Sequence, residues 1–204
     1  MVKCGRLVLV IYGIMLVGFT ILGKKFISLW LGEGYEDAYI VMLVLSWGAF
    51  LPTIQSPGEE VCRAYNKHRF LSVVYLIIAV INVIFTIVFI PRWGLLGAAI
   101  PTIISMIIGN VIIANIYYKK QFGLNILRMY TNTFHKLIIV LSLSMLIGYG
   151  INICLPQYNW GVFLLEVLLI SLVYFVLLIA FGFNNDEKQM MKSVAKKLPV
   201  LRRL

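Results

Sequence analysis

The chain has 204 residues, of which 61% are hydrophobic and 13% charged, with a net charge of +10. Soluble domains carry about 45–50% apolar and about 25% charged residues. A soluble core cannot bury this much apolar surface, so lipid must be the solvent, which excludes a soluble enzyme, a nucleic-acid-binding domain and a disordered chain. Cys4, Cys62 and Cys154 are far apart, and His68 and His135 have no acidic or thiol neighbour in sequence. The sequence therefore predicts no disulfide framework, metal site, cofactor or catalytic residue.

Six apolar runs are long enough to cross a membrane as helices. The predicted spans are Leu7–Gly23, Ala38–Gly58, Phe70–Ile90, Leu95–Tyr117, Leu137–Leu155 and Gly161–Gly182. No small-residue cleavage site follows the first run, so we do not expect a cleaved signal peptide. The fold class is thus an all-α integral membrane protein with six transmembrane helices.

The basic residues predict the orientation. Of the 18 lysines and arginines, Lys24, Lys25 and Arg92 fall in the loops on one side, and the other fifteen fall in the termini and the loops on the opposite side. The side richer in basic residues faces the cytoplasm, so both termini are predicted to be cytoplasmic. Trp30, Trp93 and Trp160 fall in the three outer turns, where aromatic rings settle at the headgroup level.

Two inner segments have an amphipathic pattern. Residues 122–133 place Phe122, Ile126 and Tyr130 opposite Arg128, and residues 188–203 alternate apolar and basic side chains at helical spacing. Each segment either lies on the inner leaflet and attracts anionic lipid, or is a solvated connector or tail.

The second span has a continuous small and polar face. This face is formed by Ser46, Ala49, Thr53, Ser56, Glu60 and Arg63. Pro52 and Pro57 should bend the same helix, because each removes a backbone hydrogen bond. The face either lines a wet cavity or packs within a plain bundle. Glu59 and Glu60 can each pair with Arg63 at helical spacing, either as a structural ion pair or as a coupling or gating carboxylate.

The third span repeats this pattern with Ser72, Tyr75, Ala79, Asn82 and Thr86. Asn82 lies near mid-membrane, where its amide either faces a cavity or bonds to another helix. The fourth span carries Gly94, Ala98, Thr102, Ser105 and Gly109 on one face, a spacing that favours close helix packing.

Glu166 is the acid that lies well inside a predicted span. We expect it to be protonated or paired, with Tyr149 and Asn152 as partners, and proton coupling is the alternative. Arg63, Lys67, His68 and Arg69 lie at the inner mouth. These residues either hold a phosphate or diphosphate headgroup or only satisfy the positive-inside rule.

Several motifs resemble those of bacterial polysaccharide flippases. They are the run 26–32 (FISLWLG) with Tyr35 and 38–39 (AY), Gln55-Ser56, the run 63–70 (RAYNKHRF), and Asn82 followed by 90–99 (IPRWGLLGAA), Thr102 and Ser105. The last run is similar to the N…IP-x-x-G-x-x-G-A-A…T-x-x-S pattern of the multidrug/oligosaccharidyl-lipid/polysaccharide exporter superfamily. The resemblance covers about Lys3 to Leu137.

The resemblance implies a role in moving a polyprenyl-diphosphate-linked oligosaccharide across the bacterial inner membrane by alternating access of two lobes. Residues 1–118 would be the four-helix part of the C-terminal lobe, 119–136 a cytoplasmic interfacial connector, 137–182 two extra C-terminal helices, and 183–204 a basic cytoplasmic tail. The second and third spans would face the cavity, with Ser46, Thr53, Gln55, Ser56, Glu60, Arg63, Tyr75, Asn82 and Thr86 as candidate lining residues. Arg63, Lys67, Arg69 and Glu166 are candidates for headgroup binding or coupling.

Family members have two lobes, so we expect the gene to continue upstream, or a second copy of the chain to supply the other lobe. Within the superfamily, a drug/cation antiporter or a peptidoglycan-precursor flippase is also compatible with the pattern. Outside it, the alternatives are a membrane enzyme of envelope glycan assembly (a polymerase, ligase or acyltransferase) and a non-transporting subunit or remnant. The outer turns offer Glu33, Glu36 and Asp37 and no histidine, which argues against an enzyme.

Overall fold

The computed structural model of the protein describes residues 2–183. These residues contain helices and connecting turns and no β-strand, and six helical segments are long and apolar enough to cross a membrane. The six predicted spans are therefore confirmed as helices. The amphipathic tail predicted over residues 188–203 lies outside the described residues.

The helices follow one another as three hairpins and one short crosspiece. They are α1 (Val2–Leu31), α2 (Glu36–Ala64), α3 (Arg69–Trp93), α4 (Leu96–Met106), η1 (Ile107–Ile113), α5 (Ala114–Phe122), α6 (Ile126–Phe134), α7 (Leu137–Cys154), α8 (Trp160–Leu177) and η2 (Leu178–Gly182). The fourth span runs through α4, the π-helical turn η1 and α5 without a break. The sixth span likewise runs from α8 into η2.

The first helix is longer than predicted, so the placement of Lys24 and Lys25 in a loop was wrong. Helix α1 continues through both lysines to Leu31. The long aliphatic stem of Lys24 is compatible with a helix near the headgroup region, and its side chain is 55% exposed. The chain turns instead at Gly32 and Gly34, whose φ angles of 86° and 96° favour glycine.

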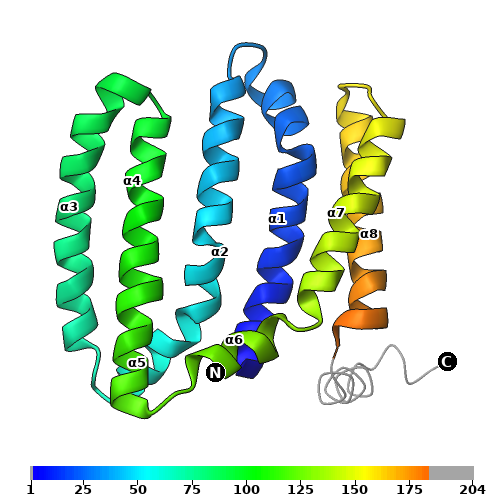
Figure 1. The fold of residues 1–204 in the computed structure, drawn as a ribbon. Helices are drawn as coiled ribbons and strands as arrows, with labels where there is room; N and C mark the ends of the chain where they lie inside the picture. The colour runs from blue at the N-terminus through cyan, green and yellow to red at the C-terminus, as the bar shows by residue number, and fades with distance from the viewer. Residues whose placement is uncertain (1, 184–204) are drawn as a thin grey trace.

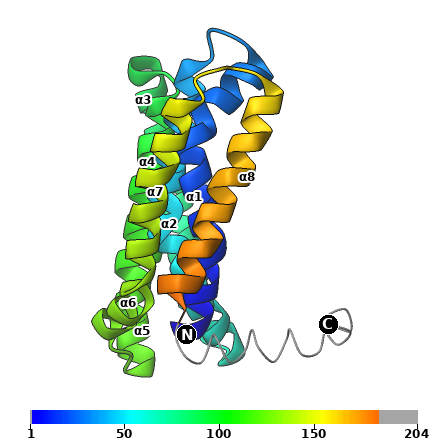
Figure 2. The same ribbon diagram turned by 90° about the vertical axis from the view of Figure 1, so that its right-hand side faces the viewer.

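The transmembrane helices stand side by side in a row, in the order α3, α4, α2, α1 and then the α7–α8 pair (Figure 1). Helix α3 is at one edge of the row and packs against α4 and η1. Helices α7 and α8 both pack against α1. All three hairpin turns lie at one end of the row, the hairpin end, and α6 crosses the other end, the α6 end (Figures 1 and 2). Because the row is about one helix thick around α2, that helix has faces that no neighbour covers.

Two apolar clusters hold the row together. The larger one joins α1, α7 and α8 around Leu9, Val17, Val140, Ile170 and Tyr174. The smaller cluster lies at the α6 end and joins α2, α3 and α5 through Cys62, Leu71, Ala114 and Tyr118. In lipid the hydrophobic effect does not drive helices together, so these contacts act through close packing and through the polar bonds described below.

Helix α6 is built by local signals in the connector. Gly123 ends α5 in a left-handed conformation, with φ 62°. Asn125 then caps α6, because its side-chain oxygen accepts a hydrogen bond of 3.1 Å from the backbone N–H of Arg128. On the face predicted to be apolar, Phe122, Ile126 and Tyr130 are half-buried, and Thr133 in the last turn of α6 is 2% exposed.

The α3–α4 hairpin generates a prediction about packing. A Cβ atom on Gly97 would overlap the backbone of Phe89 and lie 2.7 Å from the nitrogen of Ile90. We expect Gly97→Ala to lower the free energy of unfolding by about 1–3 kcal/mol, because backbone atoms of α3 must move. Thermal unfolding in detergent measures the loss. Gly150→Ala is the matched control, since a Cβ there meets nothing within 4 Å. Equal melting temperatures for the two variants would contradict this account of the hairpin.

Candidate functional site

The small and polar face of α2 is here called the polar row. Some of its side chains are hydrogen-bonded within the helix, and others are exposed. The hydroxyls of Ser46 and Thr53 donate to the carbonyl oxygens one turn earlier, Met42 at 2.7 Å and Ala49 at 2.6 Å. Further along the helix, Ser56, Glu60 and Arg63 are exposed. The row therefore continues from half-buried positions to a surface that the other described helices leave uncovered. Helix α2 also turns toward α5 in the part that follows its two prolines (Figure 1).

The two glutamates at the end of α2 have different partners. Glu60 pairs with Arg63 at 2.9 Å, as predicted, and both side chains are exposed. The predicted pair of Glu59 with Arg63 is wrong, because Glu59 accepts a hydrogen bond of 3.0 Å from the hydroxyl of Tyr75 on α3. Spacing along one helix allows both Glu59 and Glu60 to pair with Arg63. The position of α3 decides that Glu59 bonds to Tyr75 instead.

A second polar feature, here called the inner polar cluster, lies at the α6 end. Its members come from α2, α3, α5 and α6 and are Gln55, Glu59, Tyr75, Asn115, Tyr118 and Tyr130. The side-chain amide groups of Gln55 and Asn115 both donate to the hydroxyl of Tyr130, the latter at 3.2 Å. Burial raises the pKa of the Tyr130 phenol above its ordinary value, so this hydroxyl stays protonated at neutral pH.

The inner polar cluster keeps unused hydrogen-bonding capacity. Gln55 Oε1 and Asn115 Oδ1 are buried and have no partner among the described residues. Buried polar atoms are costly unless they bond to protein, water or a ligand. The inner polar cluster can therefore form hydrogen bonds with water or with a polar group of a ligand. Residues 2–183 contain no group of three His, Cys, Asp or Glu side chains that could hold a metal ion.

Part of the polar stripe of α3 faces the neighbouring helix α4. Asn82 donates a hydrogen bond of 3.4 Å to Thr102 of α4, so its amide is part of an interhelical contact. Tyr75, Asn82 and Thr86 are half-buried, whereas Ser72 and Ala79 are exposed. The small-residue face of the fourth span lies in the same contact, with Gly109 close to Ile78 and Tyr75 of α3.

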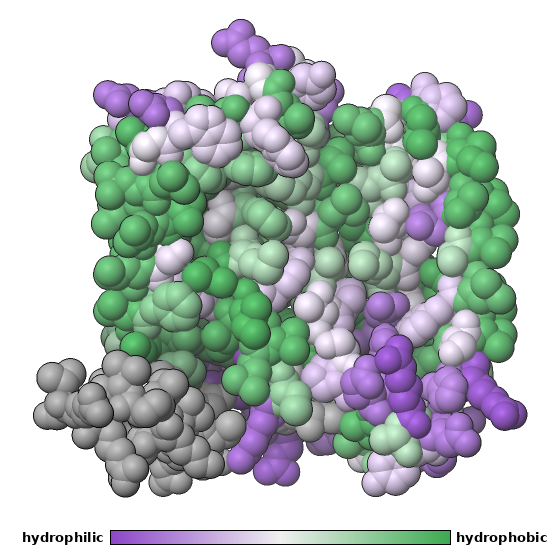
Figure 3. Space-filling view, turned by 180° about the vertical axis from the view of Figure 1, so that it is seen from behind, coloured by the Kyte–Doolittle hydropathy of each residue, from purple (hydrophilic) through white to green (hydrophobic). Residues whose placement is uncertain are grey.

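The predicted headgroup residues gather at the α6 end. Arg63 and Arg69 are exposed. Lys67 donates a hydrogen bond of 3.1 Å to Gln121, and its ammonium lies 5.4 Å from the centre of the Phe122 ring. From behind, pale and purple residues extend from this end toward the middle of the molecule between two green flanks (Figure 3). This face is thus hydrophilic at the α6 end and of intermediate hydropathy toward the middle (Figure 3).

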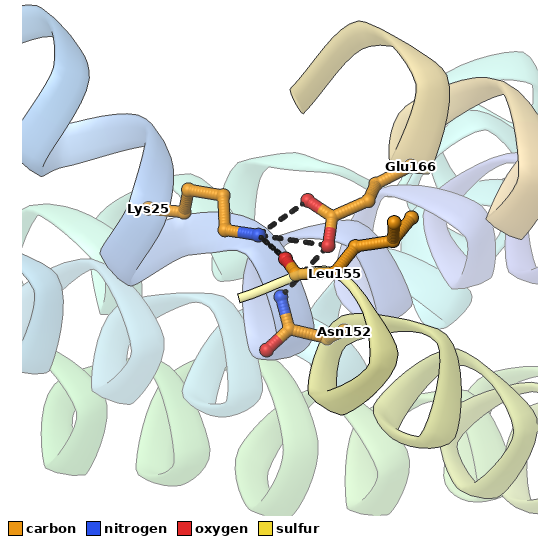
Figure 4. A network of polar contacts seen from close by, with 4 residues as sticks. All are labelled: Lys25, Asn152, Leu155 and Glu166. Atoms are coloured by element: carbon orange, nitrogen blue, oxygen red, sulfur yellow. Dashed lines mark hydrogen bonds and ion pairs between the residues drawn. The ribbon is translucent and has the colours of Figure 1, made fainter. Parts of the chain in front are cut away.

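Glu166 is paired, and its main partner is a residue that the sequence did not indicate. The ammonium of Lys25 on α1 lies 2.8 Å and 2.7 Å from the two carboxylate oxygens, with side chains 4% and 0% exposed (Figure 4). Lys25 also donates to the carbonyl oxygen of Leu155 at 2.9 Å. Asn152 donates to Glu166 at 3.4 Å, as expected, but Tyr149 is 63% exposed and does not reach it. A buried pair with additional hydrogen bonds is compatible with lipid, where a lone charge is not.

A second buried cation, Arg6, lies at the other end of α1 and is 2% exposed. Its guanidinium donates to the carbonyl oxygens of Asn132 and Thr133 at 3.3 Å and of Gly182 at 2.7 Å. It therefore joins α1 to α6 and to the end of the sixth span. Arg6 and Lys25 are among the charges from which the orientation is predicted, and both are buried here. The sequence carried a signal of burial at both positions, because each cation is flanked by apolar residues of a helix.

The comparisons with known proteins add no family to this geometry: no family model, no curated protein and no solved structure matches the chain. The class that the fold defines is a multi-pass α-helical membrane protein.

The Lys25–Glu166 pair generates a prediction about stability. Removing one partner leaves the other charge buried, which costs about 3–5 kcal/mol. We expect Glu166→Leu to melt much earlier than the original protein in detergent, and Lys25→Met/Glu166→Leu to recover most of the loss. Glu36→Leu is the matched control, because the Lys24–Glu36 pair has a longer separation of 3.6 Å and side chains 55% and 75% exposed. That exposed pair should contribute about 0–1 kcal/mol. A double variant as unstable as Glu166→Leu would contradict the charge argument.

Proposed function

We propose that the chain forms one lobe of a flippase that moves a polyprenyl-diphosphate-linked oligosaccharide across the bacterial inner membrane. The observation that carries this proposal is the uncovered polar row of α2. Ser56, Glu60 and Arg63 of this polar row are exposed. They lie on α2, which has apolar helices on both sides in the layer of transmembrane helices. No catalytic constellation accompanies this row in the described part of the chain, so transport explains it better than glycan chemistry.

The position of the row along α2 favours a wet cavity. Ser56 lies eight residues before the end of α2 at Ala64, which is about 12 Å at 1.5 Å per residue. Polar side chains at such depth usually face water or another helix. The five neighbouring spans leave this surface open, so the remaining candidates are a water-filled cavity and an opposing lobe.

The charge distribution suits a diphosphate on the cytoplasmic side. Arg63, Lys67 and Arg69 lie at the α6 end, which the positive-inside rule places in the cytoplasm. Arginine binds phosphate oxygens through paired hydrogen bonds, and lysine binds them as a point charge. The polar row would then give the glycan a path past the apolar flanks while the polyprenyl chain stays in lipid.

The single layer of transmembrane helices also implies that a second protein surface lies opposite α2. In alternating access, two lobes rock around a central site, and a single layer of helices can supply one side of that site. We propose that the opposite side comes from a second lobe, which is either encoded upstream in the same gene or supplied by a second copy of this chain. We also propose that both termini face the cytoplasm.

Water access to the polar row can be measured with cysteine labelling. In a background without Cys4, Cys62 and Cys154, we expect Ser56→Cys to react with a membrane-impermeant maleimide several-fold faster than Leu76→Cys. Both positions lie at similar depth, but Leu76 is apolar and 66% exposed on the edge helix α3. The reason is that the reactive thiolate forms in water and not in hydrocarbon. Equal rates would contradict a cavity beside α2.

Transport itself can be tested in proteoliposomes that hold the full chain at high density. The probe is a fluorescent polyprenyl diphosphate disaccharide, and a membrane-impermeant quencher reports which leaflet holds it. We expect flipping above the rate of protein-free liposomes, and about a tenfold loss in Arg63→Ala, because a charged hydrogen bond contributes about 1.5–3 kcal/mol. Arg92→Ala, an exposed arginine at the hairpin end, is the matched control. Flipping at the protein-free rate, with and without co-expressed membrane partners, would contradict the proposal.

A further inference from the structure

A cavity of about 540 Å³ lies at the hairpin end, away from the polar row of α2. Its walls come from the end of α1, the turn into α2, the start of α2 and the α7–α8 turn. This volume is within the range of small-molecule binding sites. Figure 1 shows the turns on neighbouring hairpins that contribute to this end of the molecule.

The lining combines tyrosine rings with polar groups. Tyr35, Tyr39 and Tyr158 border the cavity together with Ser28. Tyr35 and Tyr158 are 53% and 55% exposed, and their hydroxyls have no hydrogen-bond partner in the described part of the chain. Tyr39 is held in place, because its hydroxyl donates to the carbonyl oxygen of Thr20 at 3.1 Å. The cavity thus offers flat apolar rings whose polar tips are available to a ligand.

The charges at the cavity disfavour an anionic ligand. Lys24 is already offset by Glu36, 3.6 Å away, and Glu33 adds a further carboxylate to the lining. One ammonium against two carboxylates would repel a phosphate, in contrast with the basic α6 end. A ligand with many hydroxyls and no net negative charge fits better, because its hydroxyls can donate to the carboxylates and accept from Lys24.

The buried ion pair positions one wall of the cavity. Lys25 bonds to Leu155 and Glu166, and its ammonium lies 5.7 Å from the centre of the Tyr158 ring. Because Leu155 and Tyr158 belong to the same turn, the pair fixes that turn against α1. Tyr158 is therefore held in the cavity wall, together with Tyr35 of the α1–α2 turn and Tyr39 of α2, by contacts buried beneath the cavity.

We propose that this cavity is a binding site for a neutral saccharide, with the rings of Tyr35 and Tyr158 against the C–H faces of the sugar. The carboxylates, Lys24 and Ser28 would bond to the sugar hydroxyls. The choice of a saccharide rests on the proposed function, in which the glycan emerges at the hairpin end, and the site would receive it after translocation.

Saturation-transfer NMR tests the site with the full chain in lipid nanodiscs free of glycosidic detergent. The probes are the neutral disaccharides maltose and N,N′-diacetylchitobiose, with glucose 6-phosphate and choline as anionic and cationic comparisons. We expect signal transfer to at least one neutral disaccharide and none to the charged probes. Tyr35→Ala and Tyr158→Ala should each weaken binding about tenfold, which is about 1.4 kcal/mol, because each removes a flat apolar ring from the lining. Tyr149→Ala, which removes a tyrosine 63% exposed outside the cavity, should bind like the original protein.

Tyr158→Phe keeps the ring and should retain most of the binding, which guards against loss by misfolding. Absence of transfer to both disaccharides, equal binding by both alanine variants and the original protein, or a preference for choline would each overturn the proposal. The result of the binding experiment is independent of transport, because a free disaccharide can bind at the hairpin end without being moved across the membrane. Sugar binding without flipping would contradict the proposed function, and flipping without sugar binding would contradict the site.

Discussion

Two buried cations on α1 attach the last hairpin and α6 to the first helix. Lys25 fixes the α7–α8 turn at the hairpin end, and Arg6 fixes α6 and the end of the sixth span at the other. In lipid, apolar surfaces have no strong reason to associate, so hydrogen bonds from a charged group to buried oxygens carry unusual weight. Each cation is held by several oxygens, which offsets the cost of removing it from water. Helix α1 is therefore the axis to which the last hairpin is attached.

This attachment leaves the other side of the row open. With α7 and α8 packed on α1, nothing in the described structure folds back over α2. The prolines of α2 turn its lower part toward α5, where Gln55 and Glu59 meet the polar side chains of α3, α5 and α6. The same helix thus contributes to a closed polar cluster on one face and to an open polar row on another. Under the proposed function, the open polar row would form one wall of the transport cavity.

The two ends of the molecule differ in the charged and polar groups that they present. The α6 end has Arg63, Lys67 and Arg69, which suit phosphate oxygens. The hairpin end has tyrosines, carboxylates and an already paired lysine, which suit hydroxyl groups. Under the proposed function, a diphosphate and its glycan would meet different chemistry on the two sides of the membrane.

The sequence by itself determined the class of α-helical membrane protein, the six spans, and the residue types available on each helix face. Hydropathy and helical periodicity are local properties, so they can be read from the sequence. The partner of Glu60 was also local and was predicted. The tertiary structure decided that Lys25 meets Glu166, a contact between residues 141 positions apart, and that Glu59 meets Tyr75. It also decided which part of the polar row stays open. These outcomes depend on which helices become neighbours, and spacing along a single helix carries no information about that choice.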